Sequence, residues 1–545
     1  MKPLFKKTNS SKKERGQAIV LITVAFIGLV AAAGLVLDTG VLMIEYGKLK
    51  RSVDAAAVAA AQEFRPDPNT GDLNVQAMEN AVWSFLSINQ ISNVSDVVIR
   101  TCEDTTDRPA LCNPDPTGNP IENRKLVEVT ATADVQFAFM RVMGINGTSL
   151  TVTSIGEAAT IDLVLMIDTS GSMAYETTDA DGDSSNSPTP DTGDDPRVCN
   201  AADNCQPLRA VKDVAIDFVE SLIYFGYDRV AVVAMTGQAT DISSAVTRVP
   251  YPVLPLSFNE ANIINAIDDL KVFQPRICDK TYTPGECLEY FGDPPVFNRP
   301  ICQIFQLQIN AYDPNSDPSS CPSSNIGGML QLAQNAYSGS GDESNQRTES
   351  LWVSVLLASG AANSTTATDE FPNGFCPENT WLGSLNMDDV EHVKAPLSPP
   401  LPKLCRDPYP DTRHDPGDTA SYTNPLSEVV EVVNIYDADD FARDMADQLA
   451  ALKSGDGVTI YTIGLGNGVR TQSNGTPTTP CVVETTTGDR QCGEAEYLLR
   501  YIARDAGNDL NPTINHGEYF FAPNNLTLQN IFEIIAQNIS TKISE

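Results

Sequence analysis

The residues with the clearest chemical potential in this 545-residue chain follow an apolar run near its middle. Residues 161–167 (Ile-Asp-Leu-Val-Leu-Met-Ile) are typical of a buried strand. The sequence Asp-Thr-Ser-Gly-Ser-Met follows at 168–173, so that Asp168, Ser170 and Ser172 offer one carboxylate and two hydroxyls at alternate positions. These are hard oxygen ligands of the kind that Mg²⁺ prefers. Because open α/β sheets bind ligands at the carboxyl ends of their strands, we expect a ligand site here.

Strand-like and helix-like patterns alternate from residue 161 to the carboxyl terminus. This alternation predicts an α/β fold with a doubly wound parallel sheet. The expected strands are 161–167, 229–235, 351–357, 458–465 and 518–521. The expected helices are 206–225, 259–270, 326–337, 438–453, 494–506 and 526–539.

Long irregular segments interrupt this half of the chain. They lie near residues 174–205, 273–322, 361–435 and 467–493. Loops longer than about 12–15 residues are uncommon unless they are functional or disordered. We therefore expect insertions that form a cap over the site-bearing edge of the sheet.

This half of the chain resembles the von Willebrand factor A domain, on the motif at 168–173 and on three further matches. These matches are Ser-Asn-Ile-Gly at 324–327, Ala-Ser-Gly at 358–360 and Tyr-Thr-Ile-Gly-Leu-Gly at 461–466. The resemblance implies a metal-ion-dependent adhesion site for Mg²⁺, with Mn²⁺ or Ca²⁺ as alternatives, and an open position for a partner's carboxylate. The implied ligands are Asp168, Ser170, Ser172, Ser324 and Ser359. Ser359 stands where the family has an aspartate, so the predicted site is degenerate.

The amino terminus combines a basic segment with an apolar one. Six lysines and arginines fall within residues 1–16, and residues 18–37 carry no charge. Twenty helical residues span about 30 Å, which matches the hydrocarbon core of a membrane. We expect a membrane span at 17–37 with residues 1–16 in the cytoplasm and the rest outside. A cleaved signal peptide ending near 31–33 is the alternative.

Residues 38–158 show the pattern of a small α+β unit, and residues 159–545 form the second predicted domain. Helices are expected at 39–64 and 75–91, and strands at 97–99, 126–133 and 149–154. The amino-terminal region resembles the TadE/TadG-like family of tight-adherence (Flp) pilus assembly proteins. The resemblance lies in Arg-Gly-Gln-Ala at 15–18, Leu-Asp-Thr-Gly at 37–40 and Asp-Ala-Ala-Ala-Val-Ala at 54–59. It implies a pilin-like unit with a role in pilus assembly.

The chain has 12 cysteines, all in stretches rich in Pro, Gly or Asp, and without the spacing of a zinc site. In an oxidising compartment they predict disulfides, whose pairing the sequence leaves open. In order along the chain the candidates are Cys102, Cys112, Cys199, Cys205, Cys278, Cys287, Cys302, Cys321, Cys376, Cys405, Cys481 and Cys492.

The charge balance and the scattered histidines limit the possible functions. A formal net charge of −35 repels phosphate backbones, so no nucleic-acid partner is expected. None of the three histidines falls in a catalytic motif, and His414-Asp415 is expected to be a surface pair. We expect a non-enzymatic membrane protein that binds protein partners, either pilus components or a surface ligand. The alternatives are a structural scaffold subunit and a secreted enzyme with an unrecognised site in the cap.

Overall fold

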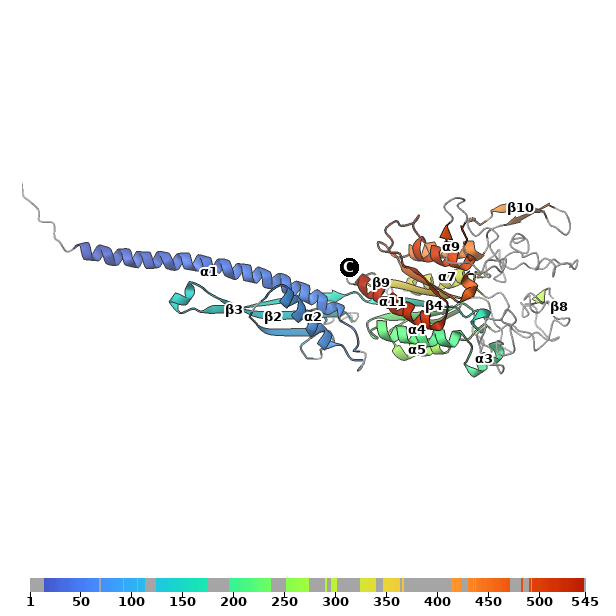
Figure 1. The fold of residues 1–545 in the computed structure, drawn as a ribbon, viewed down its shortest axis with the longest axis horizontal. Coiled ribbons are helices and arrows are strands. Elements are labelled where there is room, and N and C mark those ends of the chain that lie inside the picture. The colour runs from blue at the N-terminus through green and yellow to red at the C-terminus, as the bar shows by residue number, and fades with distance from the viewer. Residues whose placement is uncertain are drawn as a thin grey trace, which may run out of the picture. The chain divides into compact units, whose positions relative to one another are not determined.

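A computed structural model of the chain shows two compact units, residues 1–158 and residues 159–543 (Figure 1). The structure describes residues 14–67, 70–91, 93–104, 106–112, 124–174, 196–236, 251–273, 290–291, 296–300, 324–339, 347–362, 365–366, 413–416, 418–423, 430–434, 436, 438–470, 482–483, 490–491 and 493–543.

The first unit is dominated by the long helix α1 (Glu14–Gln62). The expected membrane span and the helix expected after it are therefore one continuous helix. Its first half exposes large apolar side chains, whereas alanines of its last turns are buried. Among the described residues this is the one helix long and apolar enough to cross a membrane, with a mean hydropathy of 2.8 in its most apolar window.

A three-stranded antiparallel sheet packs against α1, and α1 also contacts α2 (Val75–Ile88). Its strands are β1 (Val94–Thr101), β2 (Lys125–Gln136) and β3 (Gly147–Ala158), in the order β1-β2-β3. Two short 3₁₀ turns accompany them, η1 (Ala110–Cys112) and η2 (Met140–Met143). A Cβ at Gly156 would lie 2.1 Å from the Ala57 carbonyl oxygen, so glycine is what lets β3 approach α1 this closely.

The second unit contains a six-stranded sheet in the order β15-β12-β9-β4-β5-β6. All neighbouring pairs are parallel except β5 with β6. The strands are β4 (Ile161–Ile167), β5 (Arg229–Ala234), β6 (Tyr251–Ser257), β9 (Leu351–Ala358), β12 (Thr459–Leu465) and β15 (Tyr519–Ala522). Strand β6 was not expected from the sequence, because Pro252 and Pro255 weaken its strand pattern. Proline is tolerated at a sheet edge, which is where β6 lies.

Helices cover both faces of this sheet (Figure 1). One core joins Val164 and Met166 of β4 to α7 (Ile326–Ser338), α9 (Ala438–Ala450) and α10 (Glu494–Arg504). The other joins Leu163 and Leu165 to α4 (Leu208–Leu222), α5 (Glu260–Asp268) and α11 (Asn525–Ile543). Because side chains alternate along a strand, β4 sends apolar side chains to both cores, and Asp162 is its one polar residue.

The long irregular segments contain several short elements. A 3₁₀ turn η3 (Gly171–Ala174) and helix α3 (Pro196–Ala202) follow β4. Further along are the strand pairs β7 (Tyr290–Phe291) with β8 (Val296–Pro300), β10 (Thr419–Thr423) with β11 (Val430–Asn434), and β13 (Val482–Val483) with β14 (Arg490–Gln491). The turn η6 (Asn467–Arg470) follows β12. Most of the remaining residues in these segments lie outside the described ranges, so the expected cap stays a prediction.

Candidate functional site

The ends of two neighbouring parallel strands bring the candidate site residues together. Strands β4 and β9 pair in register up to Ile167 opposite Leu357. Asp168 follows β4 directly, and Ser359 follows β9. Because the strands are parallel, both residues leave the sheet at the same edge, although 191 positions separate them. Parallel pairing is therefore what places the sequences at 168–173 and 358–360 side by side.

Four of the five predicted ligands form one hydrogen-bonded cluster. The Asp168 carboxylate accepts the backbone N–H of Ser170 at 2.8 Å on one oxygen. Its other oxygen accepts the backbone N–H of Ser359 at 2.6 Å and the Ser359 hydroxyl at 2.7 Å. The Ser172 hydroxyl lies 2.6 Å from that of Ser359 and 2.9 Å from that of Ser170. The cluster is thus a carboxylate surrounded by three linked hydroxyls.

The accessibility of the cluster changes from one side to the other. Asp168 is fully buried and Ser170 is 1% exposed, whereas Ser172 is half-buried. The buried Asp168 carboxylate keeps three donors, which offsets the cost of removing it from water. A ligand arriving from solvent would therefore meet the Ser172 hydroxyl before it reached the carboxylate.

The oxygen atoms of the cluster are suited to a hard divalent cation, but its side chains carry only one negative charge. Every polar side-chain atom of the cluster is an oxygen, as Mg²⁺ requires. Asp168 is its one carboxylate, and Ser359 supplies a hydroxyl where a second carboxylate would add affinity. Among the residues that the structure describes, no group of three His, Cys, Asp or Glu side chains could hold a metal ion. A cation at this edge would consequently depend on Asp168 and hydroxyl oxygens.

Ser324 lies at the start of α7, directly before the N-cap. It is 5% exposed, and the neighbouring Asn325 side chain accepts the backbone N–H of Gly328 at 2.8 Å. This cap fixes where the helix begins. A Cβ at Gly327 would lie 2.3 Å from a ring carbon of Phe441, so α7 and α9 pack closely here. The second motif therefore sets the start and the packing of α7.

Thr169 holds the loop at 168–173, which we call the motif loop, from a second side. Its hydroxyl lies 2.9 Å from that of Thr236, which follows β5, and it accepts the Thr236 backbone N–H at 3.1 Å. The Thr169 carbonyl accepts the backbone N–H of Phe273 at 2.6 Å. Thr169 and Thr236 are both fully buried. The loop that carries Asp168 is thus tied to the neighbouring strand and to the segment after α5.

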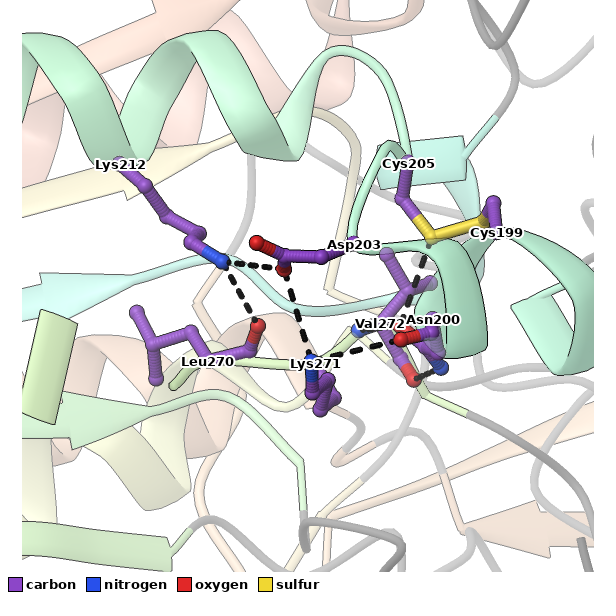
Figure 2. The surroundings of a disulfide bond; sticks show 8 residues. All are labelled: Cys199, Asn200, Asp203, Cys205, Lys212, Leu270, Lys271 and Val272. Carbon is purple, nitrogen blue, oxygen red and sulfur yellow. Dashed lines mark hydrogen bonds and ion pairs between the residues drawn. A yellow bond between two sulfur atoms is a disulfide. The ribbon is translucent and has the colours of Figure 1, made fainter. Parts of the chain in front are cut away.

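A disulfide-closed turn supports the same segment (Figure 2). Cys199 and Cys205 are bonded, with their Cα atoms 4.7 Å apart. Within the turn, the Asn200 side chain exchanges two hydrogen bonds with the Val272 backbone, at 2.8 and 2.9 Å. Val272 precedes Phe273, which donates to Thr169. The turn therefore braces the segment that contacts the motif loop.

A buried lysine completes this support (Figure 2). The ammonium of Lys212, whose side chain is 1% exposed, lies 2.8 Å from the Asp203 carboxylate. The Asp203 side chain is 45% exposed, and its partial removal from water opposes ionisation. The hydrogen bond and the positive charge of Lys212 outweigh this effect and lower the pKa of Asp203. The charged pair thus links the disulfide turn to α4, the helix that follows this turn.

Four of the predicted disulfide cysteines fall within the described residues, and they pair as chain neighbours. Besides Cys199 with Cys205, Cys102 is bonded to Cys112 with Cα atoms 5.4 Å apart. The other eight lie outside the described residues. The two observed bonds confirm the prediction of disulfides for the cysteines that can be seen.

The expectation of a surface pair at His414-Asp415 was wrong. His414 is 6% exposed, its backbone N–H donates to Asp440 at 3.0 Å, and its ring lies 3.2 Å from the same carboxylate. His414 contacts Asp440, in the first turn of α9, and not its chain neighbour Asp415. Beside it, burial raises the pKa of Asp439 to about 6 despite the nearby Arg443 guanidinium. His414 therefore helps to fix α9 to the preceding segment.

Asp38, which belongs to the sequence Leu-Asp-Thr-Gly at 37–40, is a structurally important residue. It is 3% exposed, and its carboxylate accepts the backbone N–H groups of Ala138, Phe139 and Met140 at 2.9, 3.0 and 2.6 Å. These donors open the η2 turn, which joins β2 to β3. The signal available in the sequence was an acidic residue placed directly after 20 uncharged ones.

Comparisons with known proteins give neither a family nor a curated relative. No family model matches the chain, and no curated protein matches it. Solved structures give distant similarities. The chain is similar to the von Willebrand factor domain of the type V pilus tip protein Mfa5 from Porphyromonas gingivalis, with a TM-score of 0.33 and 14% identity over 71% of this chain and 97% of that one.

Two further solved structures are similar at the same level. The PilB minor pilin from Streptococcus sanguinis has a TM-score of 0.30 and 12% identity, covering 82% of this chain and 78% of that one. The pilus adhesin SpaC from Lactobacillus rhamnosus GG has a TM-score of 0.30 and 13% identity, covering 81% and 37%. Similarities this distant assign no activity to the chain.

Proposed function

We propose that this chain is a membrane-anchored extracytoplasmic protein of a tight-adherence pilus system, which binds protein partners through a doubly wound, von Willebrand A-like domain. Helix α1 would anchor it in the cell membrane with its amino terminus in the cytoplasm. The observation that carries the proposal is the cluster of Asp168, Ser170, Ser172 and Ser359 at one edge of the parallel sheet. Ligand sites of open α/β sheets lie at this edge.

The proposed activity is recognition and not catalysis. Asp168 and the serine hydroxyls would hold Mg²⁺, with Mn²⁺ or Ca²⁺ as alternatives, and Ser324 is a further candidate ligand. The bound cation would offer a coordination position to a carboxylate of the partner. Within the cluster, the hydroxyls hydrogen-bond to one another and to Asp168, an arrangement that positions oxygen ligands and contains no nucleophile–histidine pair.

A scaffold role without metal is the second candidate, and the closed hydrogen-bond network favours it. Both oxygens of Asp168 already accept hydrogen bonds, and each hydroxyl has a partner within the cluster. The cluster therefore stabilises its loops without any ion. In this case the chain would join pilus components through the unit that contains α1.

Cross-linking of intact cells that produce the full chain separates these functions. If the proposal is right, cross-links to protein partners are lost on chelation of divalent ions and with Asp168→Asn. A matched variant, Asp217→Asn, changes the same charge on α4 and should keep them. Cross-links that persist in Asp168→Asn, but disappear when residues 18–37 are replaced by an unrelated apolar span, would refute metal-dependent binding and support the scaffold.

A further inference from the structure

The turn between β2 and β3 exposes several large apolar side chains together. Phe139 is 48% exposed, Val142 is 90% exposed and Ile145 is 45% exposed. Isolated exposed apolar residues are ordinary, but a group of them at one turn marks a site of interaction with another apolar surface. We call this turn, residues 137–146, the apolar tip.

The apolar tip lies against the membrane-spanning half of α1. Figure 1 shows the end of the β2–β3 hairpin beside this helix, and η2 contacts it. A Cβ at Gly34 would lie 2.7 Å from the Phe139 Cβ, so the glycine admits the phenylalanine. A cavity of about 260 Å³ between tip and helix is lined by apolar residues, among them Ile27, Ala31, Met140 and Val142.

Asp38 fixes the level of the tip along the helix. It follows the uncharged segment directly and binds the backbone of residues 138–140. With a rise of about 1.5 Å per residue, Gly34 lies about 6 Å and Ile27 about 16 Å from Asp38, toward the amino terminus. If residues 18–37 span the bilayer, the tip therefore lies beside the part of α1 that crosses the outer leaflet, which is about 15 Å deep.

The backbone of the apolar tip is prepared for a medium without water. The N–H groups of residues 138–140 donate to the Asp38 carboxylate. Those of Val142, Gly144 and Ile145 donate to carbonyls of Phe139, Arg141 and Met140, at 3.0 to 3.1 Å. Phe137 donates to the carbonyl of Asn146 at 3.0 Å. Backbone polar groups in lipid must be satisfied internally, because no water is available to pair with them.

We propose that the apolar tip inserts into the outer leaflet of the membrane and that acyl chains fill the cavity beside α1. This inference rests on the proposed membrane anchoring by α1. Phe139, Val142 and Ile145 would contact lipid tails, and the exposed Arg141 would extend along them to a lipid phosphate. The first unit would then be attached to the membrane through both a spanning helix and an inserted turn, which together would fix the orientation of this unit relative to the membrane.

Photo-cross-linking of the full chain in vesicles of phosphatidylethanolamine and phosphatidylglycerol tests this proposal. A benzophenone amino acid is placed at one of three exposed apolar positions, Val24, Val142 or Leu111. Val24 lies within the predicted span and reports anchoring. Leu111 serves as the control. It follows β1, and the last residue of β1 pairs with Val127. Along β2, Val127 lies about 33 Å from Phe137, so Leu111 is expected to be far from the apolar tip.

We expect lipid adducts at positions 24 and 142 and none at position 111. Adducts at 24 without adducts at 142 would overturn the insertion of the tip and leave the anchor intact. Cross-links from 142 to a second protein chain, in place of lipid, would also overturn it, since a protein would then cover the tip. An absence of adducts at both 24 and 142 would refute the anchor and the inference together.

Discussion

Replacing Ser359 by aspartate restores the carboxylate that the third motif lacks, and we expect Ser359→Asp to bind Mg²⁺ more tightly than the natural chain. The Ser359 hydroxyl is 2.7 Å from the Asp168 carboxylate, so the new carboxylate would lie about 4 Å from it and from a cation in the cluster. Two unit charges at about 4 Å interact by about 4 kcal/mol at an effective dielectric constant of about 20.

The magnitude follows from opposing electrostatic effects. A divalent cation attracts the new carboxylate by about 8 kcal/mol, and Asp168 repels it by about 4 kcal/mol. Loss of the serine hydrogen bond at the buried carboxylate costs about 1–3 kcal/mol. The remaining gain of about 1–3 kcal/mol is the net stabilisation of the metal-loaded folded state relative to the natural chain. Because the repulsion and the lost hydrogen bond are present without metal as well, they do not weaken metal binding, and the affinity for Mg²⁺ should rise by more than the factor of about 5 to 150 that this gain corresponds to. Without metal, the repulsion stays uncompensated, and Ser359→Asp should unfold at a lower temperature than the natural chain.

Calorimetric titration with Mg²⁺ and thermal unfolding, both on the full chain in detergent, measure these effects. Mg²⁺ at about 100 times its Kd should stabilise Ser359→Asp by about 2.7 kcal/mol. The control is Ser221→Asp, which adds the same charge in the last turn of α4. This turn leads into the start of β5, at the end of the parallel strands opposite to the cluster. If Mg²⁺ neither binds Ser359→Asp more tightly nor restores its stability, the cluster does not have the geometry of a metal site.

Three further predictions concern the fold around the site. Asp162→Ala should lower the free energy of unfolding by about 3–5 kcal/mol in chemical denaturation, because it removes the carboxylate that pairs with two buried guanidinium groups, those of Arg229, at 2.6 and 2.8 Å, and Arg347. Gly327→Ala should cost about 1–3 kcal/mol in the same assay, since the new Cβ overlaps the Phe441 ring; an unchanged midpoint would contradict the close packing of α7 on α9. The Asp439 pKa of about 6 exceeds the ordinary aspartate pKa of 3.8, so the folded state retains a proton that the unfolded state loses. Stability should fall by up to about 3 kcal/mol as pH rises from about 4 to about 6, and Asp439→Asn should remove this slope in pH-dependent unfolding curves.

The strand and helix pattern of the second unit was predictable because its elements are regular and apolar. Strand β4 was expected at the residues where it is found, since seven consecutive positions face a buried core. Strand β6 was not, because the pairing that admits Pro252 and Pro255 depends on its place at a sheet edge. The local sequence pattern therefore predicted strands that are apolar throughout, and it missed a strand whose sequence is tolerated only at the edge of the sheet.

The candidate site was predictable in its composition and less so in its bonding. The sequence indicated Asp168, Ser170, Ser172 and Ser359 as a group, and the structure places them in contact. It did not indicate that Ser359 donates both its hydroxyl and its backbone N–H to one carboxylate oxygen. Nor did it pair His414 with Asp440, because contacts between distant residues follow from topology and not from spacing.

The continuity of α1 has a mechanical consequence. The same helix that carries the apolar segment continues to Gln62 and packs against β3 at Gly156, without a flexible joint between them. Only Ala159 and Thr160 separate the end of β3 from the start of β4. Tension applied to the second unit would reach β3 through two residues and would load its hydrogen bonds to β2 before it reached the helix. The first unit would thus act as a stiff coupling between such a load and α1, in which the β2–β3 ladder is the element that resists shear.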